Sequence, residues 1–178
     1  MTNKYTDAFT KLLALEGRSF NDAVVVSGID ARQLRNGLDR GNMNIGEKLR
    51  VGRWAFNGRE LLELMIVDRL TTEAWVPVGQ AAAAAKIIAS HAERLFAIIQ
   101  SNASSSEENA RIVEAIVYRD DDGPGVIFHQ RGDGWGFFDL DWKRLDTGRF
   151  DKAHVRLPVI GMISDFLVGC RLAFDVEE

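Results

Sequence analysis

The stretch that decides the fold is SGIDARQLRNGLDRGNMNIG, residues 27–46, whose pattern predicts a tight turn followed by a short helix. Asp30, with Gln33 three residues later, is typical of the first turn of a capped helix. Gly41 is expected to end that helix. Three arginines fall within this stretch, although the whole chain has a formal net charge of -4. The positive charge of so short a helix therefore needs an explanation.

Helical spacing divides residues 31–39 between two faces. The apolar residues, spaced three and four apart and expected to face the core, are Ala31, Leu34 and Leu38. The polar residues that share the opposite face are Arg32, Arg35, Asn36 and Asp39. Gly37 lowers helix propensity by about 1 kcal/mol relative to alanine. A close approach of other atoms at this position would account for it.

The flanking sequence predicts further helices and a hairpin. A short helix is expected over residues 6–15, and a second one after Ser19, which forms a capping pair with Asp22. Residues 49–56 alternate apolar and polar side chains about a predicted Gly52-Arg53 turn, which would place Arg53 at the tip of a hairpin. Asn57 then caps a helix with an apolar face that extends to Leu70.

The rest of the chain predicts an α+β protein in three parts. Residues 1–75 would form the N-terminal helical domain, residues 76–102 a long linking helix, and residues 103–178 a small domain containing strands. A polar linker is expected over residues 101–109, followed by strands near 111–118, 125–129 and 135–140. Residues 158–174 predict a final helix, with a buried strand as the alternative.

Charge is distributed unevenly along the sequence. Residues 30–59 hold seven basic and three acidic residues, whereas residues 103–178 hold fifteen acidic and nine basic ones. This asymmetry favours a basic surface for an anionic partner on an otherwise acidic body. A solvated charged face with no partner is the alternative that charge alone leaves open.

The order of the expected elements resembles the winged helix-turn-helix domain of the MerR family of bacterial transcription regulators. The resemblance covers about residues 20–70, and its motifs are SGIDARQLRNGLDRG (27–41) and GRWAFNGRELLEL (52–64). Arg35 and Asp39 fall where that family commonly carries an arginine and an acidic residue, and Trp54 falls where it carries a wing aromatic. Asn36 and Gly37 depart from the pattern, because the family usually has aromatic residues there.

The resemblance implies that the helix over residues 31–39 enters the major groove of double-stranded DNA and that the hairpin touches the backbone beside it. Arginine can pair with guanine and asparagine with adenine, and both also hold phosphates. The residues expected at base edges or nearby phosphates are Arg32, Gln33, Arg35 and Asn36. The residues expected at the DNA backbone or wing are Arg40, Lys48, Arg50, Arg53 and Trp54.

The family also pairs two subunits through a long helix, which here would follow Pro77. The three-four spacing of apolar residues in this region predicts a helix seam. The residues expected at the homodimer contact are Ala84, Ile88, His91, Leu95 and Ile98. Burial of the same seam against the C-terminal part of one chain is the alternative.

Other chemistry is not supported by the sequence. The three histidines are scattered, and no nucleophile or acid–base pair predicts catalysis, so no enzyme, metal or cofactor is expected. Cys170 is expected to be a buried thiol, and the aromatic residues of 135–142 to be core rather than a ligand pocket. The start of the chain predicts no secretory signal and therefore a cytoplasmic protein. The sequence thus favours a dimeric DNA-binding transcription regulator, with a structural or adaptor DNA-binding protein as the alternative and any small-molecule effector unknown.

Overall fold

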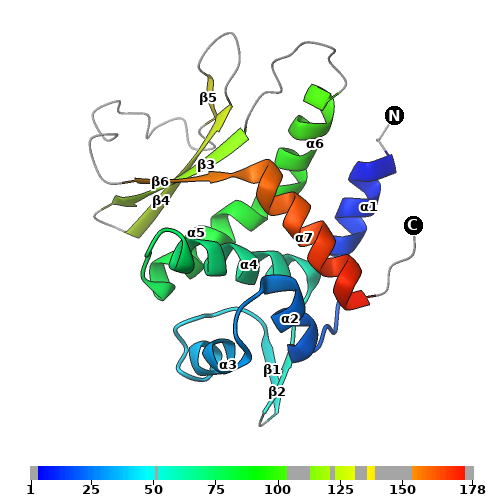
Figure 1. Ribbon diagram of the computed structural model, residues 1–178, viewed down its shortest axis with the longest axis vertical. Coiled ribbons are helices and arrows are strands. Elements are labelled where there is room, and N and C mark those ends of the chain that lie inside the picture. Colours follow the sequence, from blue (N-terminus) through cyan, green and yellow to red (C-terminus); the bar gives the residue numbers. More distant parts are fainter. Residues whose placement is uncertain are drawn as a thin grey trace.

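The computed structural model describes residues 4–50, 52–103, 113–120, 123–130, 136–138 and 154–174, and it has an α+β fold as expected (Figure 1). The helices are α1 (Lys4–Leu13), α2 (Phe20–Ser27), α3 (Ala31–Asp39), α4 (Gly58–Thr72), α5 (Val78–Ser90), α6 (Ala92–Ala103) and α7 (Val159–Phe174). The strands are β1 (Glu47–Arg50), β2 (Arg53–Ala55), β3 (Val113–Asp120), β4 (Gly123–Gln130), β5 (Gly136–Phe138) and β6 (His154–Pro158). No helix among the described residues is both long and apolar enough to cross a membrane.

The strands form two separate sheets. The β1–β2 hairpin stands at the end of the molecule that also carries α3 (Figure 1). The second sheet has the order β5-β4-β3-β6, and all of its neighbouring strands are antiparallel. The sequence predicts its first three strands but not β6, which leads directly into α7.

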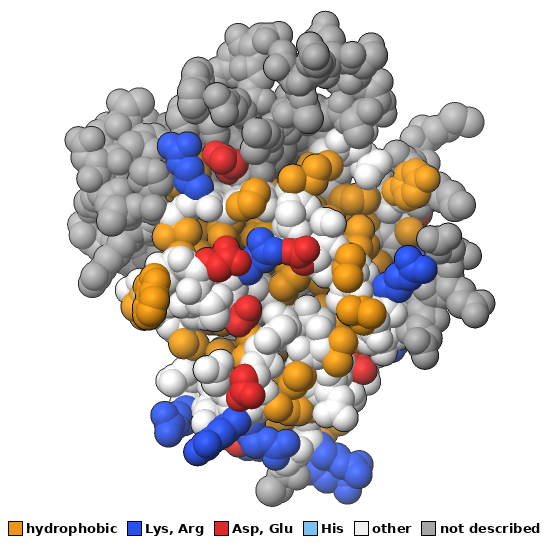
Figure 2. Space-filling view, viewed as in Figure 1, with side chains coloured by type: hydrophobic (Ala, Val, Ile, Leu, Met, Phe, Trp, Pro, Cys, Tyr) orange, Lys and Arg blue, Asp and Glu red, His pale blue; other side chains and the backbone are white. Residues whose placement is uncertain are grey.

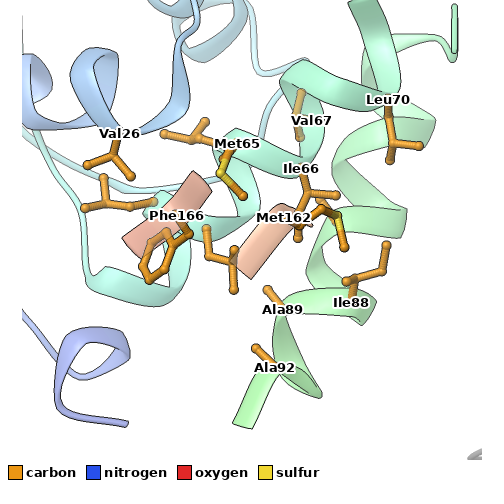
Figure 3. Close-up of a cluster of buried hydrophobic side chains, with 14 of the residues drawn as sticks. Val26, Met65, Ile66, Val67, Leu70, Ile88, Ala89, Ala92, Met162 and Phe166 are labelled. Atoms are coloured by element: carbon orange, nitrogen blue, oxygen red, sulfur yellow. The ribbon is translucent and has the colours of Figure 1, made fainter. Parts of the chain in front are cut away.

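The core is centred on α4, which is buried on nearly every side. Its fully or almost fully buried apolar side chains are Leu61, Leu62, Leu64, Met65, Ile66, Val67 and Leu70. Figure 3 shows side chains of α4, α5 and α7 meeting in this cluster, with Ile88 on one side and Met162 and Phe166 on another. A helix that is apolar all round has to be enclosed by other elements, and here α2, α5 and α7 enclose it.

The buried cluster contains residues from all three parts of the chain that the sequence predicted as separate. It includes Leu34 of α3, Ile88 of α5, Phe128 of β4 and Phe166 of α7. The final helix α7 returns to pack against α2, where a side-chain carbon added at Gly169 would lie 2.9 Å from the Val26 carbonyl oxygen. The boundaries at residues 75 and 103 therefore do not separate independent cores.

The expected linking helix over residues 76–102 is wrong in one respect, because it consists of two helices. α5 ends at Ser90 and α6 begins at Ala92, with His91 between them at φ -105° and ψ 3°. The His91 ring nitrogen Nδ1 lies 2.9 Å from both the Ser90 hydroxyl and the Ile87 carbonyl oxygen. Neither proline nor glycine marks this break, so helical periodicity passes through it undetected.

The predicted homodimer seam is largely buried inside one chain. Ala84, Ile88 and Leu95 are at most 4% exposed, and His91 is half-buried with its ring 5.5 Å from that of Phe128. The side chain of Ile98 lies outside the described residues. The three buried residues therefore pack within one chain, where α5 lies against both α4 and β4 and α6 lies against both α1 and α7, so the C-terminal part supplies only some of the contacts.

Other expectations differ in detail or remain outside the described structure. The first helix begins and ends two residues earlier than expected, and the final helix matches its expected range. Cys170 is buried as predicted, and burial raises the pKa of its thiol to about 12, opposed by the nearby Arg18 charge. Most of the expected linker over residues 101–109 lies outside the described residues, as do Trp135 and Trp142.

Replacing Ile88 with aspartate should unfold the chain rather than separate a dimer. Ile88 is 2% exposed, so a carboxylate there would lose its hydration with nothing to replace it. We expect the free energy of unfolding to fall by about 4 kcal/mol or more in urea titration. Ile87→Asp is the matched control, because Ile87 is 37% exposed and should change stability by less than about 1 kcal/mol. Equal stabilities of the two variants would contradict the burial of Ile88.

The buried carboxyl of Glu63 should make the free energy of unfolding depend on pH. Burial raises the pKa of its carboxyl to about 7, helped by the Glu60 charge and opposed by those of Lys86 and Arg59. Because the folded-state pKa lies above the ordinary value of 4.5, the carboxyl does not reduce stability below about pH 4.5. Its cost grows as the pH rises from about 4.5 to about 7 and stays constant above that.

Glu63→Gln should therefore stabilise the protein more at pH 8 than at pH 5. The gain should increase by roughly 3 kcal/mol between the two values, since one pKa unit corresponds to about 1.4 kcal/mol. Urea titrations at both pH values measure it. Glu16→Gln makes the same charge change at an exposed position and should show little pH dependence. A gain for Glu63→Gln that is the same at both pH values would contradict the burial of the carboxylate.

Candidate nucleic-acid interface

The turn between α2 and α3 is fixed by a buried serine. The Ser27 hydroxyl donates to the Ala23 carbonyl oxygen at 2.6 Å and accepts from the Ile29 backbone N–H at 3.2 Å. Gly28 has φ +78°, a left-handed conformation that glycine adopts without steric cost. The Ser-Gly-Ile sequence therefore sets the angle at which α3 leaves α2.

The structure confirms the predicted N-cap of α3, which is Asp30. The Asp30 carboxylate accepts hydrogen bonds from the backbone N–H groups of Arg32 at 2.9 Å and Gln33 at 3.1 Å. Leu34 and Leu38 are buried as predicted, whereas Ala31, expected on the same face, is exposed. Ala31 stands in the first turn, where α3 has not yet come into contact with the core.

Gly37 is explained by the methionine that packs on it. A side-chain carbon added at Gly37 would lie 2.9 Å from both the sulfur and the terminal carbon of Met43. The Gly37 carbonyl oxygen also accepts from the backbone N–H groups of Asn42 and Met43. The chain after α3 is thus folded back against the helix at this position, which accounts for a glycine inside it.

The outward face of α3 is exposed and polar. Its residues Arg32, Arg35, Asn36 and Asp39 are all exposed, as the spacing predicts. Figure 2 shows Lys and Arg side chains gathered at the lower end of the molecule, where α3 and the hairpin lie in Figure 1. We call the outward face of α3 together with the β1–β2 hairpin the basic face.

Two basic side chains of this face lie over aromatic rings. The guanidinium carbon of Arg35 is 5.0 Å from the centre of the Phe20 ring on α2. The ammonium nitrogen of Lys48 is 5.4 Å from the centre of the Trp54 ring and 3.2 Å from an Asp39 carboxylate oxygen. Such contacts restrict the side chains while leaving hydrogen-bond donors directed outward. Trp54 is half-buried, so it supports Lys48 more than it exposes a surface of its own.

The hairpin turn is one residue earlier than predicted. Arg50 pairs with Arg53, so the turn falls between these two residues, and Gly52, just before Arg53, has φ +73°. Arg53 therefore begins β2, beside the tip rather than on it. The two arginines are exposed and directly opposite each other across the hairpin, an arrangement that is destabilising for like charges unless an anion offsets it.

The base of the hairpin is joined to the helices on either side. Arg18 and Phe56 exchange backbone hydrogen bonds of 2.8 and 3.0 Å, just before α2 and just after β2. Phe56 is 1% exposed, and Asn57 and Glu60 form the predicted capping box at the start of α4. The hairpin is therefore fixed to the core at one end, and its arginines project from the other.

Three of the predicted site residues border a pocket beside the outward face, and Asn36 belongs to both. Gln33, Asn36 and Arg40 line a pocket of about 390 Å³ between α3 and the C-terminal half of α4. Arg59, the last basic residue of the segment over residues 30–59, is turned away to α5 and α6. Its guanidinium donates to the Ala89 carbonyl oxygen at 3.1 Å and pairs with Glu93 at 3.7 Å.

The arginines of the basic face differ from those elsewhere in their ionic partners. Arg59, Arg69 and Arg156 each pair with a carboxylate, those of Glu93, Asp165 and Glu114 respectively. Among the described residues, no carboxylate lies within ion-pair distance of the arginines of α3 and the hairpin, which are Arg32, Arg35, Arg40, Arg50 and Arg53. This part of the surface keeps its positive charge available.

Sequence reasoning missed the residues on the α4 side of the pocket. Asp68, Thr71 and Thr72 line it, and Asp68 is half-buried. They fall three and four residues apart and so share one face of α4, a spacing that was present in the sequence. In the described part of the chain, no three His, Cys, Asp or Glu side chains gather closely enough to hold a metal ion.

Comparison with known proteins assigns neither a family nor a function to this chain. No model of a known protein family matches this chain, and no curated protein matches it either. The role of the basic face has to be argued from its own geometry and charge.

Proposed function

We propose that this protein is a sequence-specific DNA-binding transcription regulator of winged helix-turn-helix type, with α3 as its recognition helix and the β1–β2 hairpin as its wing. The observation that carries the proposal is the set of five arginines, on α3, at its C-cap and on the hairpin, that have no carboxylate partner in the part of the chain that the structure describes. An exposed guanidinium with no carboxylate partner is suited to phosphate oxygens and guanine edges.

The shape of the basic face supports the proposal. α3 has nine residues and is exposed along Arg32, Arg35 and Asn36, while Leu34 and Leu38 attach it to the core. A major groove about 12 Å wide admits one α-helix, and a helix that is buried on one side only can enter it. The turn at Gly28 separates α2 from α3, so α3 can be presented without α2 covering it.

The hairpin suits the sugar-phosphate backbone beside that groove. Arg50 and Arg53 face each other across β1 and β2, and Lys48 lies nearer the base of the same hairpin. A phosphate between two guanidinium groups would offset their repulsion and release counterions. Such contacts strengthen binding without reading sequence.

A contrast between two arginine variants tests the proposal. DNA sequences bound by the protein are first selected from a random duplex pool, and affinities are then measured by fluorescence anisotropy at several salt concentrations. Arg35→Ala should weaken binding to the selected site by about 1–3 kcal/mol and change little for random DNA. Arg53→Ala should weaken both equally and reduce the dependence of affinity on salt.

Arg94→Ala provides the matched control, since Arg94 is an exposed arginine on α6, away from the basic face. It removes one positive charge and should leave both affinities nearly unchanged. A parent protein that selects no sequence, or an Arg94 variant that loses as much affinity as the Arg35 variant, would overturn the proposal. Broad rather than site-specific occupancy of genomic DNA would indicate the structural or adaptor role instead.

We further propose that the protein binds its site as a homodimer, because one recognition helix covers only a few base pairs and two-fold pairing lengthens the site. The seam at Ala84, Ile88 and Leu95 cannot supply this contact, since it is buried within the chain. Light scattering of the free protein should give twice the chain mass of 19.9 kDa, or a complex with a selected site should contain two chains after the mass of the DNA is subtracted. A single chain per selected site would contradict the dimer and the expectation of a palindromic operator.

A further inference from the structure

The pocket between α3 and α4 has the composition of a small-molecule site. Its volume of about 390 Å³ falls within the range of ligand pockets in proteins. Ile29, Val67 and Val78 supply apolar lining, and the first two are buried. Polar groups come from both helices, Arg40 from α3 and Asp68 from α4.

Asp68 is a carboxylate without a hydrogen-bond donor among the described residues. Burial raises the pKa of this carboxyl, as does the Glu73 charge, while the Arg69 charge lowers it. The guanidinium of Arg69 is itself engaged by Asp165. The protein therefore leaves the Asp68 carboxylate short of a positive partner, at a point where it lines the pocket.

The hydroxyl groups beside Asp68 are oriented as acceptors. Thr71 Oγ1 donates to the Val67 and Asp68 carbonyl oxygens at 2.9 and 3.0 Å, and Thr72 Oγ1 donates to the Asp68 carbonyl oxygen at 2.7 Å. A hydroxyl that donates its only proton to the backbone keeps its lone pairs for accepting. This side of the pocket is thus suited to a donor-rich cation such as an ammonium group.

The opposite helix supplies the complementary charge. Arg40 lines the pocket from α3, no carboxylate among the described residues pairs with it, and the charges acting on Asp68 are those of Glu73 and Arg69. The pocket therefore holds two opposite charges that do not satisfy each other. Its apolar residues provide a surface for a hydrocarbon chain between two charged ends.

We propose that this pocket binds a small zwitterion, with its ammonium group at Asp68, Thr71 and Thr72 and its carboxylate at Arg40. Gln33, Asn36 and Arg40 also belong to the residues expected to contact DNA, so an occupied pocket would compete for them. The ligand would then weaken DNA binding, and DNA would weaken ligand binding by the same factor. This regulatory consequence rests on the proposed function, whereas ligand binding itself does not.

Ligand binding is tested without DNA. The probes are β-alanine, 4-aminobutyrate and 6-aminohexanoate, which present the same two charges at increasing separation, with butylamine and butyrate as single-charge controls. Backbone amide NMR shifts of the full chain should move in residues 29–43 and 67–78 for at least one zwitterion. The dissociation constant should be on the order of millimolar, as expected for so few atoms, and at least tenfold weaker for the single-charge probes.

Variants of the two charged groups assign the ends of the ligand. Asp68→Asn and Arg40→Gln should each weaken binding of the best probe at least tenfold. Glu73→Gln, which changes a charge at the C-cap of α4 without lining the pocket, should weaken it less than twofold. Thermal melts check that each variant is folded.

The outcomes separate the site from its proposed regulatory effect. No shift with any zwitterion, or butylamine binding as tightly as the best zwitterion, would overturn the site. If a zwitterion binds and the protein binds DNA, the probe at ten times its dissociation constant should weaken DNA binding at least threefold, and an unchanged affinity would overturn the competition. A protein that binds the probe but no DNA would overturn only the proposed function and the regulatory consequence that rests on it.

Discussion

The burial of α4 is the constraint on which the rest of the structure depends. Leucine, methionine, isoleucine and valine side chains project from this helix in nearly every direction, and its buried positions extend from Gly58 to Leu70. Such a helix cannot remain at a surface, so α2, α5 and α7 have to pack around it. The close crossing at Gly169 and Val26 allows α7 to complete this enclosure although it lies a hundred residues further along the chain.

The basic face is a consequence of the same enclosure. Leu34 and Leu38 attach α3 to the core by one side, and Phe56 attaches the hairpin by its base. On the remaining sides of both elements, the ion pair that the described residues form joins Asp39 to Lys48. Among the described residues, Arg32 and Arg53 therefore have no carboxylate partner, although the chain has an excess of acidic residues overall.

Local features of the fold could be predicted from the sequence because local chemistry determines them. The Asp30 cap and the turn at Gly28 depend on residues within a few positions of each other, and both are confirmed. The prediction of a dimer seam was wrong for Ile88 because helical periodicity shows that this residue has to be buried but not which surface buries it. The break at His91 could not be found because no residue there is incompatible with a helix. The pocket could not be predicted from the sequence, because Arg40 and Asp68 are far apart along the chain and line one pocket only in the folded structure.

Unpaired arginines in an acidic protein have a physical consequence beyond the contacts they make. If the protein binds DNA as proposed, the excess negative charge elsewhere on the chain would repel it, so only the basic face would approach it closely and the orientation of first encounter would be restricted. The Asp39 carboxylate pairs with Lys48 at the junction of α3 and β1, whereas Arg32 and Arg53 on either side have no carboxylate partner among the described residues. The positive charge is thereby concentrated at two separate places, one on the helix and one on the hairpin. A phosphate backbone beside an open groove presents negative charge in a similarly divided way, and an acidic ligand with a single charge does not.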